Sequence, residues 1–229
     1  AAYALAVIGY GLYWLIQKRR HSKQGEMLTE AIESDLDARF GKQNDKGELQ
    51  LIQQQMKESI QLIRKSKLGD KRGNAALYEL PWYMVIGNPA AGKSSAIYNS
   101  GLKFPFEESH QKMVSSGLSG TRNCDWFFST QGVLLDTAGR YSVYAEDQSE
   151  WLGFLNLLKK SRSKAPINGL IVMVSISELI SQSPEKSIKL AKNLRARIQD
   201  LTERLEVFTP VYLVFSKMDL IAGFTDFFD

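Results

Sequence analysis

The chain has 229 residues, 44% of them hydrophobic and 24% charged, with a formal net charge of +4 and one cysteine, Cys124. These proportions are those of a globular protein and exclude a disordered tail, a collagen-like fibre and a disulfide-rich mini-protein. Lys18, Arg19, Arg20 and Lys23 account for the charge excess, since the other 25 of the 29 basic residues match the 25 acidic ones. The excess is one local cluster rather than a basic face, so nucleic-acid binding is disfavoured.

The first 16 residues contain no charged side chain and directly precede the basic cluster. As a helix they span about 24 Å, slightly less than the roughly 30 Å hydrocarbon core of a bilayer. Because the chain opens on Ala1 rather than Met, we expect residues 1–20 to be a truncated transmembrane helix with a basic stop. The positive-inside rule then places the residues after about 20 in the cytoplasm. A buried core helix is the alternative, whereas a signal peptide carries its basic residues before the apolar run.

Residues 21–75 are expected to form a cytoplasmic helical hairpin and a linker. Two apolar stripes at helical spacing flank a polar segment with glycine at both ends, Gly41 and Gly47, which breaks the helix. The stripes are Leu28, Ile32, Leu36 and Phe40, and then Ile52, Met56, Ile60 and Ile63. Stripes of this kind are typical of packing rather than of a functional site.

Residues 76–229 alternate short apolar runs with helical patterns, which predicts an α/β domain with a mixed, mostly parallel sheet. The predicted strands cover 83–86, 125–128, 133–135, 170–174 and 211–215. The second and third of them form a hairpin that adds one antiparallel edge strand. A long amphipathic helix is predicted between Pro184 and Pro210.

Residues 87–94 read G-N-P-A-A-G-K-S and match the phosphate-binding loop pattern G-x-x-x-x-G-K-[ST] at every fixed position. A predicted strand precedes the loop and a helix can follow from Lys93. In such a loop backbone N–H groups hold the phosphates, the lysine reaches the β- and γ-phosphates, and the serine, here Ser94, ligates Mg²⁺. We therefore expect GTP or ATP to bind with Mg²⁺, with Lys93 also serving catalysis. The expected contacts are Gly87, Asn88, Pro89, Ala90, Ala91, Gly92, Lys93, Ser94 and Ser95.

Two further segments are expected to complete the phosphate end of the site. Asp136 follows an apolar strand in the sequence D-T-A-G, where it would hold Mg²⁺ and Gly139 would offer its N–H to the γ-phosphate. Thr121, in a small polar stretch between the two motifs, is the candidate for a second hydroxyl on the metal and for a catalytic role. An ordinary strand end with a turn glycine, and a solvated loop, explain the same residues and remain open.

The last two candidates concern the base and the attacking water. The segment S-K-M-D at residues 216–219 is similar to the guanine-reading pattern [NT]-K-x-D, with Lys217 and Asp219 in place and Ser216 departing from it. GTP and ATP both remain possible, as does a charged turn with no base contact. Arg140 follows Gly139, where Ras-like proteins often carry a water-orienting Gln. Arginine is no base near neutral pH but stabilises phosphoryl charge, so Arg140 is a catalytic candidate with slow turnover.

The sequence resembles the IcmF/TssM family of secretion-system inner-membrane proteins. Besides the phosphate loop within 80–95, the similar segments are N-S-G-L-K-F-P at 99–105, G-T-R-N-C-D-W at 120–126, L-L-D-T-A-G-R-Y at 134–141 and S-K-M-D-L-I-A-G-F at 216–224. Arg140 is thus what the family pattern has.

The resemblance implies a Ras-like P-loop NTPase domain, incomplete here at its C-terminal end, on a bacterial inner-membrane protein with a further span and a large periplasmic region. It implies a mainly structural subunit of a type VI secretion membrane complex. The implied partners are TssL, the lipoprotein TssJ, TssK and other baseplate proteins, further copies of the subunit and membrane lipid. The alternatives are an active Ras-like GTPase or ATPase switch and the IcmF subunit of a type IVB secretion system.

Overall fold

The computed structural model describes residues 76–104, 124–143 and 147–228, together with six helical positions: 50, 51, 54, 57, 58 and 61. The chain divides into two compact units, Ala1–Gly47 and Glu48–Asp229, and every described residue belongs to the second. The predicted transmembrane helix and most of the predicted helical hairpin therefore lie outside the described residues. Within the described part, no helix combines the length and the apolar character needed to cross a membrane.

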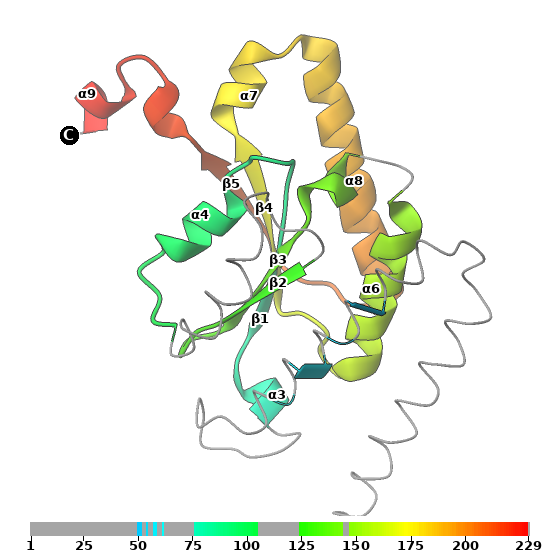
Figure 1. Ribbon diagram of the computed structural model, residues 1–229. Helices are drawn as coiled ribbons and strands as arrows, with labels where there is room; N and C mark the ends of the chain where they lie inside the picture. Colours follow the sequence, from blue (N-terminus) through cyan, green and yellow to red (C-terminus); the bar gives the residue numbers. More distant parts are fainter. Residues whose placement is uncertain are drawn as a thin grey trace, which may run out of the picture. The chain divides into compact units, whose positions relative to one another are not determined.

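Five strands form one sheet in the order β2-β3-β1-β4-β5 (Figure 1). The central strand β1 (Trp82–Ile86) lies between β3 (Val133–Thr137) and β4 (Gly169–Ser175) and is parallel to both. Strand β5 (Val211–Ser216) continues the parallel sheet beyond β4, and β2 (Cys124–Phe128) is antiparallel to β3 at the other edge. The predicted α/β class and the mixed, mostly parallel sheet are confirmed.

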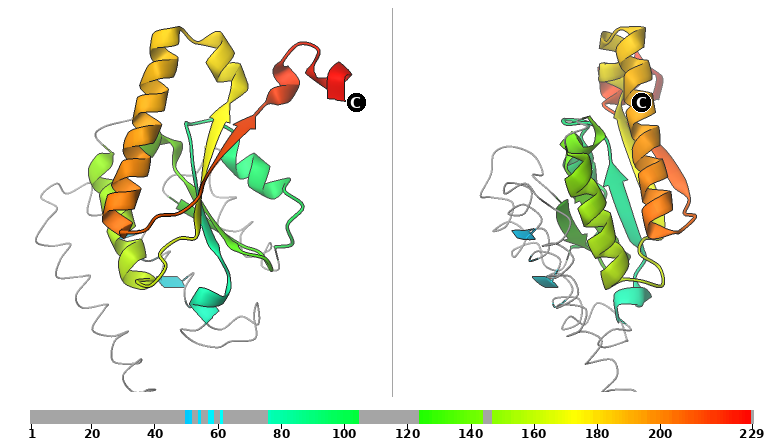
Figure 2. Two further views of the ribbon diagram at one scale, coloured as in Figure 1. Left: turned by 180° about the vertical axis from the view of Figure 1, so that it is seen from behind. Right: turned by 90° about the vertical axis from the view of Figure 1, so that its right-hand side faces the viewer.

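Helices lie on both faces of this sheet. Helices α6 and α8 lie side by side on one face, and α4 lies on the other (Figures 1 and 2). The helical elements are α3 (Ala76–Glu79), α4 (Lys93–Tyr98), the 3₁₀ turn η2 (Gly139–Ser142), α6 (Gln148–Ser161), α7 (Ile176–Ser181), α8 (Pro184–Leu205), the 3₁₀ turn η3 (Met218–Leu220) and α9 (Phe224–Phe228). Helix α8 begins at the predicted Pro184, whereas the sequence reading did not identify α6.

Helix α6 supplies much of the core. Trp151, Phe154, Leu155 and Leu158 are completely buried, and their spacing of three or four residues places them on one side of the helix. On the α4 side of the sheet a second cluster of buried residues is formed by Val85, Ile97 and Phe127, with Phe104, Leu134 and Ile171 packed against it. The central strands are thus covered on both faces, as a parallel sheet requires.

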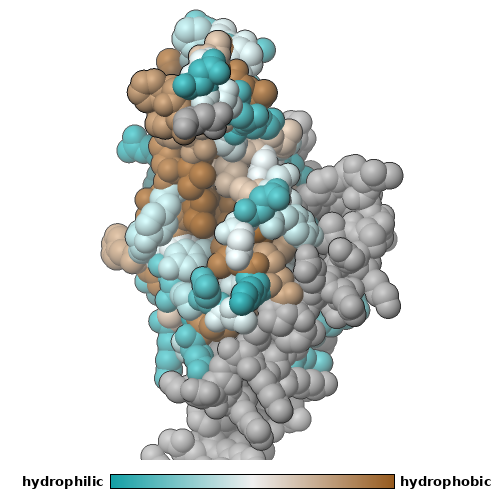
Figure 3. Space-filling view, turned by 90° about the vertical axis from the view of Figure 1, so that its left-hand side faces the viewer, coloured by the Kyte–Doolittle hydropathy of each residue, from teal (hydrophilic) through white to brown (hydrophobic). Residues whose placement is uncertain are grey.

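Strand β5 differs from the interior strands because its apolar side chains are exposed. Each residue from Val211 to Phe215 is between 37% and 58% exposed, although the strand pairs with β4 along its length. The side of the molecule that carries β5 and α9 shows an extended apolar area in Figure 3. This strand therefore depends on backbone pairing with β4 more than on burial.

Arg162 joins the end of α6 to the start of the sheet from a buried position. Its guanidinium donates hydrogen bonds to the carbonyl oxygens of Leu80 and Ala165 and to Oδ1 of Asn168. It also lies over the ring of Trp82, 4.8 Å from the centroid. Burial lowers the pKa of Arg162 to about 10, so the side chain stays charged at neutral pH.

We predict that Arg162→Met lowers the free energy of unfolding by about 3 kcal/mol, because three acceptor oxygens lose the charged donor that a buried guanidinium supplies. Urea unfolding followed by far-UV circular dichroism measures the change. The matched control is Arg195→Met, at an exposed position of α8, which should change stability by less than about 0.5 kcal/mol. Equal losses in the two variants would show that the buried contacts of Arg162 do not stabilise the fold.

Candidate nucleotide-binding site

The predicted phosphate loop joins β1 to α4 at the carboxyl end of the central strand. A methyl group at Gly87 would lie 2.3 Å from the carbonyl oxygen of Met173 in β4, so only glycine fits this position. Gly92 has a φ of +82°, in the left-handed region that glycine adopts without strain. The two fixed glycines of the motif are therefore required by the backbone itself.

Lys93 lies across the loop. Its Nζ donates to the carbonyl oxygens of Gly87 (3.0 Å) and Asn88 (3.1 Å), and the residue is only 7% exposed. Burial lowers the pKa of Lys93 from its ordinary value, while the negative charge of Asp136 opposes that shift. An ammonium group has three donors, so one further N–H can bind an anion held by the loop.

Ser94 and Asp136 bring together the first helical turn of α4 and the end of β3. Ser94 Oγ donates to Asp136 Oδ2 at 2.5 Å, and Asp136 is completely buried. A hydroxyl beside a carboxylate fits Mg²⁺, which takes oxygen ligands and one or two carboxylates together with phosphates. Among the described residues, no group of three or more His, Cys, Asp and Glu gathers at one point.

Gly139 lies directly against the phosphate loop. A methyl group here would lie 2.3 Å from the backbone nitrogen of Pro89 and 2.7 Å from the carbonyl carbon of Asn88. Two residues earlier, Thr137 Oγ1 donates to the carbonyl oxygen of Val85 (2.8 Å), which fixes the end of β3 to β1. The structure thus brings the D-T-A-G segment and the phosphate loop into backbone contact, as the sequence suggested.

Ser216 connects the loop after β5 to the phosphate loop. Its hydroxyl donates to the carbonyl oxygen of Ala91 at 2.6 Å. The residue that departs from the [NT]-K-x-D pattern therefore supplies a hydroxyl donor, as a threonine would. Lys217 follows with a φ of +58°, and both Lys217 and Asp219 have exposed side chains at this end of the sheet.

The sequence reading did not identify Glu178 as a neighbour of the loop. The side-chain amide of Asn88 donates to Glu178 Oε1 (3.0 Å), which also accepts from Nε2 of Gln182 (2.6 Å). Glu178 and Gln182 both belong to the segment that follows β4. The parallel pairing of β1 with β4 was the available signal, because it brings the carboxyl ends of these strands together.

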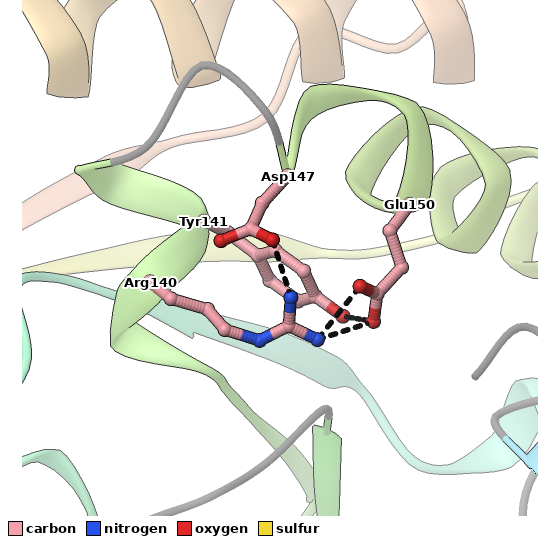
Figure 4. Close-up of polar contacts among 4 residues, drawn as sticks. All are labelled: Arg140, Tyr141, Asp147 and Glu150. Carbon is pink, nitrogen blue, oxygen red and sulfur yellow. Dashed lines mark hydrogen bonds and ion pairs between the residues drawn. The ribbon is translucent and has the colours of Figure 1, made fainter. Parts of the chain in front are cut away.

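Arg140 points toward α6, as Figure 4 shows. Nη1 is 2.6 Å from Asp147 Oδ1, and Nη2 is 2.6 and 2.7 Å from the two carboxylate oxygens of Glu150. The hydroxyl of Tyr141 also donates to Glu150 Oε1, at 2.5 Å. Burial acts to lower the pKa of Arg140, but the bonds and charges of the two carboxylates outweigh it and raise the pKa. Burial and the bond to Glu150 also raise the pKa of Tyr141.

The structure therefore gathers Lys93, Ser94, Asp136 and Gly139 at one edge of the sheet, with Ser216 adjoining. Thr121 lies outside the described residues. Asp147 and Glu150 were not predicted as partners of Arg140. Asp147 directly precedes α6 and Glu150 lies in its first turn, and the sequence had not predicted this helix.

Two comparisons with known proteins bear on this chain. The model of the IcmF-related N-terminal domain matches residues 144–229. The chain is 46% identical over 187 residues to the type VI secretion system component TssM1 of Pseudomonas aeruginosa (strain PAO1), an alignment that covers 80% of this chain. The chain belongs to the IcmF/TssM family. It spans about a sixth of the length of that relative, since the alignment covers 17% of it.

We predict that Ser216→Ala lowers the free energy of unfolding by about 1 kcal/mol, because the carbonyl oxygen of Ala91 loses its donor. Ser216→Thr is the matched control, since it keeps the hydroxyl and should restore most of the loss. Both are measured by urea unfolding of the whole chain. If alanine and threonine behave alike, the hydroxyl contributes nothing to the contact between β5 and the phosphate loop.

Proposed function

We propose that residues 76–229 form a Ras-like P-loop NTPase domain that binds GTP or ATP together with Mg²⁺. One observation carries this proposal: Lys93 crosses the phosphate loop while Ser94 and Asp136 meet beside it. A bound triphosphate with a divalent metal requires three such groups: the ammonium of a lysine, a hydroxyl and a carboxylate.

The proposed contacts follow from this geometry. Backbone N–H groups of residues 87–95 surround the phosphates, and the ammonium of Lys93 binds the β- and γ-phosphates. Ser94 and Asp136 hold Mg²⁺, with Thr121 as the further ligand, and Gly139 donates its N–H to the γ-phosphate. The metal, when bound, neutralises charge on the phosphate oxygens.

Base recognition is proposed for the loop after β5. Lys217 and Asp219 follow Ser216, whose bond to Ala91 holds their loop beside the phosphate loop. An aspartate here accepts hydrogen bonds from guanine and finds no matching donors on adenine, so its contribution is measured by comparing GTP with ATP.

Slow hydrolysis is proposed because Arg140 stands where a water-orienting Gln is often found, and arginine is no base near neutral pH.

At the level of the whole protein, we infer a structural inner-membrane subunit of a type VI secretion system. The support is the 46% identity to a protein named as a type VI component, which favours this system over type IVB. Anchoring by residues 1–20, with the chain after about residue 20 in the cytoplasm, rests on the apolar run and the basic cluster. TssL, TssJ, TssK with other baseplate proteins, further copies of the subunit and membrane lipid are the proposed partners, on the family resemblance.

We predict that the detergent-solubilised chain binds GTP or ATP with Mg²⁺ and that Lys93→Ala weakens this affinity about tenfold or more, roughly 1.4 kcal/mol. Titration of a fluorescent GTP or ATP analogue measures both. Lys192→Ala is the matched control, because Lys192 is exposed on α8. Absence of binding by the unmodified chain at millimolar nucleotide would contradict the assignment.

In the bacterium, we expect Lys93→Ala to leave assembly and secretion intact, because the proposed role of the subunit is structural. Secretion and recovery of the membrane complex are measured together in cells that carry the variant as the sole copy. Lost secretion with an intact complex would instead favour an active GTPase or ATPase switch.

A further inference from the structure

We propose that Arg140, Tyr141, Asp147 and Glu150, named here the Arg140 cluster, act as a clamp that holds Gly139 against the phosphate loop. Arg140 is then a positioning residue for the N–H of Gly139 and does not itself contact phosphate. This proposal rests on the proposed nucleotide function. It states that the Arg140 cluster makes the site sensitive to the presence of the γ-phosphate.

The side chains of the Arg140 cluster are bonded to one another. Glu150 has a side chain only 5% exposed, and its two oxygens accept bonds from Nη2 of Arg140 and from the hydroxyl of Tyr141. Asp147, with 19% of its side chain exposed, takes the other guanidinium nitrogen, Nη1. Both carboxylates lie at the start of α6, where the helix dipole also favours negative charge.

Release of Arg140 toward a phosphate would break this arrangement. It would leave the nearly buried carboxylate of Glu150 without its cationic partner, which is costly because a buried charge needs a compensating one. A phosphate contact would have to repay that cost. The geometry thus favours a guanidinium that stays on α6.

The clamp reaches the phosphate loop through the short turn η2. Arg140 and Tyr141 are the second and third residues of η2, whose first residue is Gly139. The N–H of Tyr141 donates to the carbonyl oxygen of Ala138 (3.2 Å), which closes the turn around Gly139. Holding the two side chains at α6 therefore fixes the backbone position of Gly139 beside Pro89.

The other end of the clamp is anchored in the core. The ring of Tyr141 lies 5.8 Å from that of Trp151, measured between centroids, and Trp151 is completely buried. The clamp thus links Gly139 to α6, a helix that is anchored in the core by Trp151. Because the N–H of Gly139 is proposed to meet only the γ-phosphate, loosening the clamp should weaken triphosphate binding and spare diphosphate binding.

The test compares Glu150→Gln, Arg140→Gln and the double variant in the whole chain, using fluorescent GTP and GDP analogues with Mg²⁺, or the adenine pair if ATP binds more tightly. We expect each single variant to lose about tenfold in triphosphate affinity and less than about twofold in diphosphate affinity. The double variant should be no weaker than either single one, because all three remove the same clamp. Asp147→Asn, at the more exposed partner, should show a smaller loss of the same kind.

Glu206→Gln is the matched control, since Glu206 pairs with Lys159 in the last turn of α6 (2.7 Å) and is 75% exposed. It should leave both affinities unchanged.

The outcomes separate the possible roles. If Arg140 contacts phosphate, Glu150→Gln releases the guanidinium and triphosphate affinity stays or rises while Arg140→Gln lowers it, which overturns the clamp. Equal losses for triphosphate and diphosphate indicate general destabilisation and overturn it as well. Absence of any binding by the unmodified chain overturns the nucleotide function and the clamp together, whereas normal binding in every variant overturns the clamp alone.

Discussion

Two backbone contacts at the carboxyl end of β1 leave no room for a side chain, and the site depends on them. At Gly87 a methyl group would meet the carbonyl oxygen of Met173, and at Gly139 it would meet the backbone of Pro89, each at 2.3 Å. The end of β4, the phosphate loop and the segment after β3 are therefore in direct contact. This contact places the first turn of α4 within a hydrogen bond of Asp136, so that the hydroxyl of Ser94 meets the carboxylate while the ammonium of Lys93 lies across the same loop. With any larger residue at either glycine, the strands would have to separate and the three groups would lose their shared position.

Side chains from other elements then fix the loop. Lys93 donates hydrogen bonds to the carbonyl oxygens of Gly87 and Asn88, and Ser216 donates one to the carbonyl oxygen of Ala91. The amide of Asn88 is held in turn by Glu178. A loop whose carbonyl groups are already bonded has little freedom to rearrange, and such preorganisation is what the proposed phosphate contacts would use.

The sequence was most informative where short-range chemistry decides the structure. The apolar runs predicted all five strands, and the hairpin at residues 125–135 predicted the antiparallel edge. The motif also predicted that a helix follows from Lys93, and α4 begins at that residue. Helix α6 was not predicted, although Trp151, Phe154, Leu155 and Leu158 have helical spacing and the residue before the helix, Asp147, is of a type preferred at helix N-termini. The partners of Arg140 could not be predicted without that helix, because they depend on the direction in which η2 points its side chains.

The two ends of the site are supported unequally. The Arg140 cluster is bonded to a helix whose aromatic residues are completely buried. The loop with Lys217 and Asp219 follows β5, which pairs with β4 alone among the described strands and exposes its apolar residues. Local unfolding favours segments with little buried apolar surface, so β5 and its loop should open at a lower free energy than β1 or β3. Opening of β5 would break the bond from Ser216 to Ala91 and leave the contact of Gly139 with the phosphate loop in place. In the proposed site, the base contacts and the phosphate contacts therefore rest on parts of the fold with different stabilities, and the bond from Ser216 to Ala91 links these two parts.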